Sequence, residues 1–159
     1  MSSKTFCNLL RITIIAVALC GLVTCILILP SMGTALATNN PEFAHWRIPW
    51  LFFFWASSVP FFVVLVIGWK VAGAIRHEKF FSLQTANLMK VCSMVLFCGA
   101  GFFLLGNGAL LLFDMSHPAI LLVSFFAVIF CALLATVAAA LSHYIAKAAA
   151  LQTEAEGTI

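Results

Sequence analysis

The chain has 159 residues, of which 64% are hydrophobic and 8% are charged, and its mean hydropathy is +1.16. Soluble domains are about 45–50% apolar and about 25% charged, so this composition excludes an ordinary soluble domain and predicts an integral membrane protein. The formal net charge of +3 suits a surface that meets anionic lipid headgroups. The basic residues flank apolar runs and lack interleaved aromatic residues, so no nucleic-acid partner is expected.

Four long apolar runs are predicted to span the membrane: residues 12–29, 50–69, 91–113 and 119–141. The shortest has 18 residues, enough to cross about 30 Å of hydrocarbon at about 1.5 Å per residue. Pro30 is expected to close the first run. Basic residues before this run and Ala35-Leu36-Ala37 after it also suit a cleaved signal peptide, but the run exceeds the usual apolar core of roughly 7 to 15 residues. An uncleaved first span is therefore favoured.

The first connection contains NNPEFAHWRIP. Asn40 is expected to cap a short helix with Pro41 at its first position, because asparagine accepts free N–H groups and proline lacks one.

The second span lies between Trp50 and Trp69, which are 19 residues apart. On a helix this is about 28 Å, so both are expected to anchor the span at the lipid boundaries. Pro60 removes a backbone donor and should bend the helix, and the hydroxyls of Ser57 and Ser58 are expected to bond the freed carbonyls.

The third span is rich in glycine, and small residues let helices approach closely in a membrane. Asn107 lies within it and must find a partner, so a hydrogen bond to another helix is favoured over a ligand or ion contact. The fourth span has a small residue at every fourth position, a stripe expected to pack on the glycines of the third span. The stripe is Ala127, Cys131, Ala135 and Ala139, and the glycines are Gly99, Gly101, Gly106 and Gly108.

Orientation follows from the basic residues, because an excess of Lys and Arg marks the cytoplasmic side of a membrane protein. Of the eight, only Arg47 falls on the side opposite the segment 70–90. The other seven are Lys4, Arg11, Lys70, Arg76, Lys79, Lys90 and Lys147. The predicted fold is an all-α integral membrane four-helix bundle, in a cell membrane with both termini in the cytoplasm.

The cytoplasmic segment 70–90 is expected to form an elbow that lies on the membrane surface. Ser82 can cap a helix that starts at Leu83 and runs into the third span, and the apolar spacing of this helix suits a membrane surface. The tail, residues 142–159, is expected to extend the last helix. Candidate contacts to a partner or to lipid are Arg76, Lys79, Lys90, Glu154 and Glu156.

Two motifs carry a family resemblance. In AIRHEKFFSLQTANLMK, a basic turn and Phe-Ser precede an amphipathic helix start that ends in Leu-x-Lys. In the ending ALQTEAEGTI, Gly157 stands where an apolar residue is usual, and the matching residues are Glu154, Glu156, Thr158 and Ile159. Both motifs resemble the bacterial membrane proteins grouped as domain-of-unknown-function family 2975. The resemblance implies four spans, no accepted activity, and a regulatory or stress-linked role, since members are often encoded beside small helix-turn-helix regulators.

Metal candidates are two carboxylate-x-x-His pairs on the outer side: Glu42 with His45, and Asp114 with His117. Two imidazoles and two carboxylate oxygens match the ligands of zinc. The competing interpretation is that short polar turns need such residues to meet water and to cap helices. No cofactor is expected.

The sequence contains no G-x-S-x-G, no glycine-rich phosphate loop and no H-E-x-x-H, so a non-enzymatic protein is predicted. We expect a small partner-binding, regulatory or sensing protein, and its expected partners are membrane lipids, a cytoplasmic protein or further copies of itself. The alternative is an oligomeric transporter or channel for an apolar or small solute. The four spans contain no Asp, Glu, Lys, Arg or His, which disfavours proton coupling.

Overall fold

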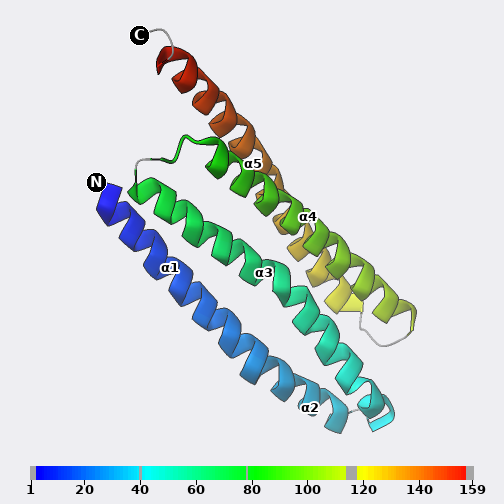
Figure 1. The fold of residues 1–159 in the computed structure, drawn as a ribbon. Coiled ribbons are helices and arrows are strands. Elements are labelled where there is room, and N and C mark those ends of the chain that lie inside the picture. The colour runs from blue at the N-terminus through cyan, green and yellow to red at the C-terminus, as the bar shows by residue number, and fades with distance from the viewer. Residues whose placement is uncertain (1–2, 40, 78, 114–117, 157–159) are drawn as a thin grey trace.

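Figure 1 shows the computed structural model of the chain, which describes residues 3–39, 41–77, 79–113 and 118–156. All regular secondary structure in these ranges is helical, which confirms the predicted all-α class. The elements in chain order are α1 (Ser3–Val23), a π-helical turn (Thr24–Ile28), α2 (Leu29–Asn39), a 3₁₀ helix (Pro41–Trp46), α3 (Arg47–Arg76), α4 (Leu83–Leu112) and α5 (Pro118–Glu156).

Four helical stretches of the described chain are long and apolar enough to cross a membrane: Thr5–Asn39, Ala44–Arg76, Leu83–Leu112 and Leu121–Ala155. They overlap all four runs predicted from the sequence, and each continues beyond the predicted span. The short helix predicted to begin at Pro41 is the 3₁₀ helix. Its predicted cap, Asn40, lies outside the described residues.

Pro30 does not end the first helical run, contrary to the prediction, but is the second residue of α2. The N–H of Leu29 bonds the carbonyl of Thr24, five residues back, so the backbone reaches the proline in π-helical register. In this register the Cys25 carbonyl would accept from residue 30, which as a proline has no N–H. The indole N–H of Trp55 on α3 donates to that carbonyl at 3.0 Å. The wider turn and the donor from α3 together accommodate the proline.

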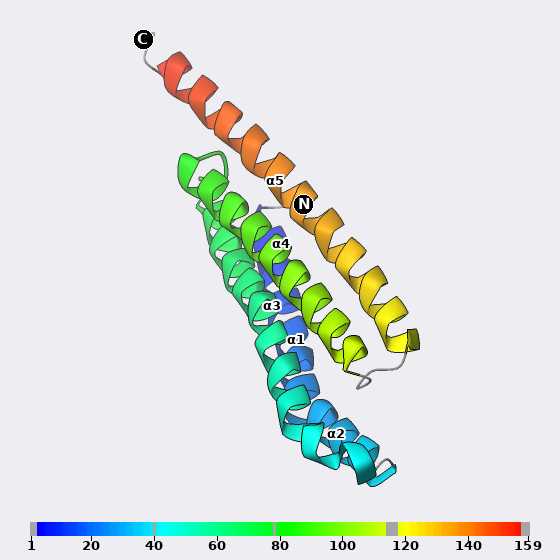
Figure 2. The same cartoon turned by 90° about the vertical axis from the view of Figure 1, so that its right-hand side faces the viewer.

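The helices form an open layer in chain order. The extensive contacts of the described chain join α1 and α2 to α3, α3 to α4, and α4 to α5, and Figures 1 and 2 show this succession from two sides. The prediction was a four-helix bundle. The four long helices are present, but in the described chain α1 and α5 share no extensive contact, so the helices do not close into a ring. The buried core lies where α3, α4 and α5 meet, and its residues are Ile67, Val71, Cys92 and Ala138.

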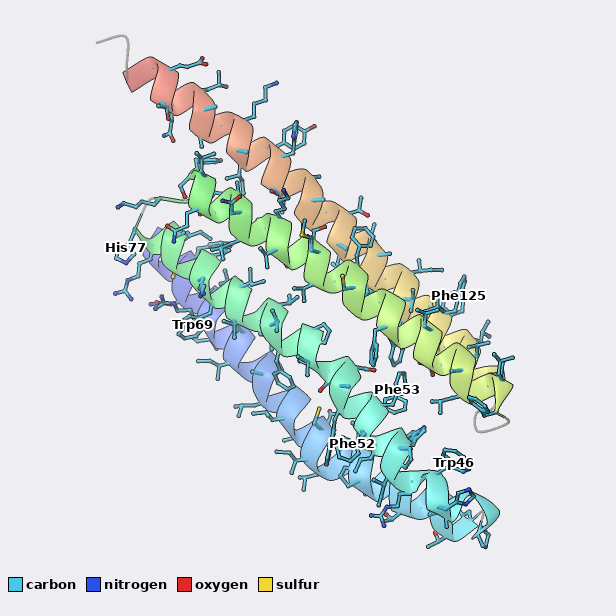
Figure 3. All side chains as sticks on the ribbon, turned by 45° about the vertical axis from the view of Figure 1, so that its right-hand side comes forward. Trp46, Phe52, Phe53, Trp69, His77 and Phe125 are labelled. Atoms are coloured by element: carbon cyan, nitrogen blue, oxygen red, sulfur yellow. The ribbon has the colours of Figure 1, made fainter. Side chains whose placement is uncertain are left out.

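The seam between α3 and α4 repeats every seven residues. Phe53 faces Gly106, and Pro60 faces Gly99; the same register continues to Ile67 and Cys92 in the core, and a seven-residue repeat is the pattern of helices that pack side by side over a long distance. A Cβ atom on Gly99 would lie 2.8 Å from Cβ and Cγ of Pro60, and one on Gly106 would overlap the Phe53 ring. Figure 3 shows Phe53 between the two helices.

The seam between α4 and α5 is lined by small side chains. On α4 the buried residues again recur every seven positions, at Ala86, Ser93, Ala100 and Asn107. On α5 one series of buried or half-buried residues alternates in steps of four and three: Ser124, Val128, Cys131, Ala135, Ala138, Ser142, Ile145 and Ala149. Leu121, Ala132, Ala146 and Ala148 beside this series are also half-buried.

The predicted four-residue stripe on α5 is therefore wrong at two of its positions, because Ala127 and Ala139 are exposed. A helix that must follow its neighbour over many turns repeats every 3.5 residues, and a strict spacing of four drifts off the seam. The predicted partners were also wrong, since Gly99 and Gly106 pack on α3 rather than on α5.

Glycine 99 offers a first test. Gly99→Ala is expected to lower the free energy of unfolding by about 1–3 kcal/mol, because the rigid Pro60 ring cannot yield to an added methyl group. Gly101→Ala is the matched control, since nothing lies within 4 Å of its Cβ position; it should be neutral or stabilising by up to about 1 kcal/mol through helix propensity. Unfolding in mixed micelles measures the free energy of unfolding of both variants. Equal effects of the two substitutions would contradict the close contact of Gly99 with Pro60.

Trp55 offers a second test. Trp55→Phe keeps the aromatic packing but leaves the Cys25 carbonyl without a donor in an apolar medium, so we expect a loss of about 1–3 kcal/mol in the same assay. Trp46→Phe, at the exposed end of the 3₁₀ helix, is the control and should cost less than Trp55→Phe. An unchanged stability for Trp55→Phe would show that the indole does not satisfy the proline-containing turn.

Candidate functional site

The connection between α3 and α4 is shorter than predicted. The helices continue into the predicted elbow, α3 as far as Arg76 and α4 from Leu83 onward, so a separate surface-lying segment over 70–90 is not formed. The capping prediction is confirmed, because the Ser82 hydroxyl accepts the N–H of Thr85 at 3.3 Å. Thr85 is buried and donates its own hydroxyl to the Lys79 carbonyl at 3.4 Å. These bonds fix the start of α4 against the connection.

Basic and aromatic side chains from neighbouring helices lie at one level near this end. The guanidinium of Arg11 on α1 lies 4.8 Å from the ring centroid of Trp69 on α3, a cation–π contact. Because Pro60 faces Gly99, and both Trp69 and Lys90 are nine residues from that contact, Lys90 of α4 lies at the same level along the helices as Trp69. Figure 3 shows Trp69 near one end of the layer and Trp46 at the other.

A groove of about 470 Å³ lies between α4 and α5 at this level. Its polar lining includes Asn87 and Lys90 on α4 and His143 on α5, and its apolar lining includes Met94 and Ala139. The groove exists because the residues beneath it are small. They are Ala86 and Ser93, which are buried, and Ser142, whose hydroxyl donates to the Ala86 carbonyl at 2.7 Å.

Beyond the groove, α5 continues as an arm, defined here as residues 144–156. Figures 1 and 2 show it in orange and red, projecting past the ends of α3 and α4. Tyr144 and Leu151 are 69% and 58% exposed on it, and their seven-residue spacing places them on one face. Ile145 and Ala149 on another face are buried.

The predicted contact residues are spread along this end. Arg76, at the last turn of α3, and Lys79, in the connection, are both exposed. A pairing of Lys90 with Glu154 is ruled out, because Ser142 is level with Ala86, Glu154 is twelve residues farther along the arm, about 18 Å, and Lys90 lies in the opposite direction. The side chain of Glu156 lies outside the described residues.

Residues 31–159 match the family described as "Protein of unknown function (DUF2975)". The chain belongs to the DUF2975 family. The match begins in α2 and runs through the groove and the arm, which confirms the resemblance seen in the two motifs. No curated protein and no solved structure matches the chain. The family description assigns no activity, so the function of this DUF2975 protein has to be argued from its own geometry.

The three polar residues predicted to lie inside the membrane, Asn107, Ser57 and Ser58, are hydrogen-bonded within the protein. Asn107 donates to the Phe103 carbonyl at 2.8 Å and accepts the Ser124 hydroxyl at 3.2 Å, which confirms the predicted interhelical bond. Ser57 and Ser58 donate to the carbonyls of Phe53 and Trp55, both at 2.7 Å. These are carbonyls of the turn before Pro60, so the prediction that the serines bond the carbonyls freed by the proline is wrong.

The predicted metal ligands are only partly described. His45 is exposed in the 3₁₀ helix and lies against Trp46, with ring centroids 5.2 Å apart. Glu42 belongs to the same helix, but its side chain is outside the described set, as are Asp114 and His117. Among the described residues, no group of three or more His, Cys, Asp or Glu is placed to hold a metal ion.

The Asn107–Ser124 pair offers a third test. In a double-mutant cycle, Asn107→Ala and Ser124→Ala should show a coupling of about 0.6 and at most about 1.7 kcal/mol, the range measured for interhelical hydrogen bonds in membranes. Thr136→Ala is the control partner for Asn107, because its hydroxyl bonds Ala132 within α5 at 2.8 Å. Its coupling with Asn107 should be near zero. A coupling as large for Thr136 as for Ser124 would contradict a specific bond.

Proposed function

We propose that this DUF2975 protein is a non-enzymatic protein of the bacterial cell membrane that binds a cytoplasmic protein as a regulatory or sensing element. The end that carries Arg76, Lys79 and the α5 arm would face the cytoplasm, because seven of the eight Lys and Arg residues fall on that side. The four apolar helices support the membrane location. The level of Arg11, Trp69 and Lys90 then marks the boundary between lipid and cytoplasm.

The observation that carries the proposal is the exposed apolar face of the arm. The 39 residues of α5 extend over about 58 Å, roughly twice the hydrocarbon thickness, so the arm lies in water if the rest spans the bilayer. Large apolar side chains exposed to water on one helix face are the usual sign of a protein-binding surface. Tyr144 and Leu151 form such a face.

The occupant that suits this face is an amphipathic helix of a cytoplasmic protein. Tyr144, Ala148, Leu151 and Ala155 follow one another in steps of four, three and four, the spacing of a helix that pairs with another helix. Lys147, which is exposed beside this face, would favour an acidic residue on the partner. Glu154, exposed near the tip of the arm, would add a polar contact with the partner.

Site-specific photo-crosslinking in cells tests this function. A crosslinker at Tyr144 or Leu151 should capture one and the same cytoplasmic protein, and a crosslinker at Thr153, about 200° around the helix from Leu151, should not. Leu151→Glu should remove at least nine tenths of the adduct formed from position 144. A membrane-impermeant thiol reagent should label Lys147→Cys only after the cells are opened, as a check on orientation.

Equal adducts from all three positions would mean that the arm has no preferred face. Adducts of this chain with itself alone would contradict binding to a cytoplasmic protein and would support the oligomeric alternative. Labelling of Lys147→Cys in intact cells would overturn the orientation.

A further inference from the structure

We propose that the groove between α4 and α5 binds one anionic phospholipid. Its phosphate would lie on Lys90 and His143, and an acyl chain would run along Met94 and Ala139. This inference goes beyond the protein-binding role of the arm, but it shares the proposed position of the membrane surface. Four features of the groove support it.

The first feature is the charge and hydrogen-bonding character of the rim. Lys90 supplies an ammonium group from α4, His143 supplies a ring N–H from α5, and Asn87, three residues before Lys90 on the same face of α4, supplies an amide. All three line the groove, and among the described residues no carboxylate does. An array of donors with a fixed positive charge binds an anion, and phosphate accepts from lysine and from uncharged donors alike.

The second feature is the order of polar and apolar lining along the helix axis. Leu83 and Ala146 line the groove nearest the connection. Asn87 and Lys90 follow along α4, and Met94 lies one turn beyond Lys90. On α5, Ala139 lies one turn from His143 in the same direction, because the two helices are antiparallel. A groove whose polar residues have apolar lining beside them suits an amphiphile, whereas a free phosphate ion would use the polar residues alone.

The third feature is the depth at which the basic end lies. Lys90 is at the level of Trp69, and the Arg11 guanidinium lies over the Trp69 ring. Tryptophan and basic residues concentrate at the headgroup level of a bilayer. Basic pockets between membrane helices on the cytoplasmic side are suited to anionic headgroups, so a lipid of that leaflet meets the rim at its phosphate and the groove at its acyl chain.

The fourth feature is the state of the floor. The Ser142 hydroxyl already donates to the Ala86 carbonyl, so it needs no hydrogen bond from a ligand. This bond also holds α4 and α5 together beneath the groove. The volume of about 470 Å³ falls within the range of about 300–1,000 Å³ that is usual for ligand sites. The floor is thus stable without lipid, and the lipid fills a preformed depression.

Native mass spectrometry of the full chain tests the proposal. The protein is purified in a neutral detergent with added phosphatidylglycerol, and the fraction that retains one lipid is measured. Lys90→Gln should weaken retention about tenfold, the change expected when a hydrogen bond to a charged group is lost. Lys70→Gln is the matched control, because Lys70 is exposed on α3 beside Trp69, at the same level and outside the groove. It should retain the lipid as the wild type does.

A second variant separates a lipid from a free anion. Ala139→Leu adds bulk to the apolar lining of the groove, at an exposed position where the fold tolerates it, and leaves Lys90 and His143 unchanged. It should reduce lipid retention about tenfold, and inorganic phosphate at millimolar concentration should not displace the lipid from the wild type. Far-UV circular dichroism and the unfolding midpoint in micelles should match the wild type for all three variants.

Three results would overturn the proposal. One is an equal loss of lipid from Lys90→Gln and Lys70→Gln, which would mean diffuse electrostatic attraction. Another is displacement by inorganic phosphate without any effect of Ala139→Leu, which would mean an anion site. The third is a wild type that retains no lipid. None of these lipid measurements involves Tyr144 or Leu151, so a negative lipid result would not contradict the protein-binding role of the arm. In the same way, a negative crosslinking result would not contradict the lipid site.

Discussion

Helices surrounded by hydrocarbon gain no hydrophobic driving force from touching one another, so they associate where small residues let their backbones come close. α4 meets this condition on two sides, through columns that are one residue apart in the sequence. One column contains Cys92, Gly99 and Gly106 and faces α3, and the other contains Ser93, Ala100 and Asn107 and faces α5. The layer is therefore built outward from α4, and the groove, the connection and the arm take their positions from it.

The same apolar medium requires every backbone and side-chain polar group to be satisfied inside the protein. Three bonds between helices meet this requirement at different depths: Trp55 to the Cys25 carbonyl, Ser124 to Asn107, and Ser142 to the Ala86 carbonyl. Each joins helices that are already neighbours through small residues. Packing and hydrogen bonding thus specify one register, and the level of Lys90 relative to Trp69 and His143 is a result of that register.

The sequence predicted what depends on local chemistry. Four spans followed from uninterrupted apolar runs, the start of α4 from Ser82, and the partner of Asn107 from the cost of an unpaired amide. It failed where the outcome depends on a second helix. The passage through Pro30 needs the indole of Trp55, the seam of α5 follows the 3.5-residue repeat of a partner, and the open order of the helices is not encoded in any one of them.

The groove was also missed. Its signal is the set of small residues Ala139, Ser142 and Ala146 around His143, which becomes a depression only opposite Ala86 and Ser93.

The unbroken length of α5 has a mechanical consequence. A single rigid rod joins the far side of the layer to the tip of the arm, so any change in its inclination is magnified along its length. If bilayer thinning tilted a rod of about 58 Å by about 10° around its outer end, the tip would move sideways by about 10 Å. In a bilayer, the position of Leu151 would therefore depend on the membrane thickness without any change in the internal structure of the helix.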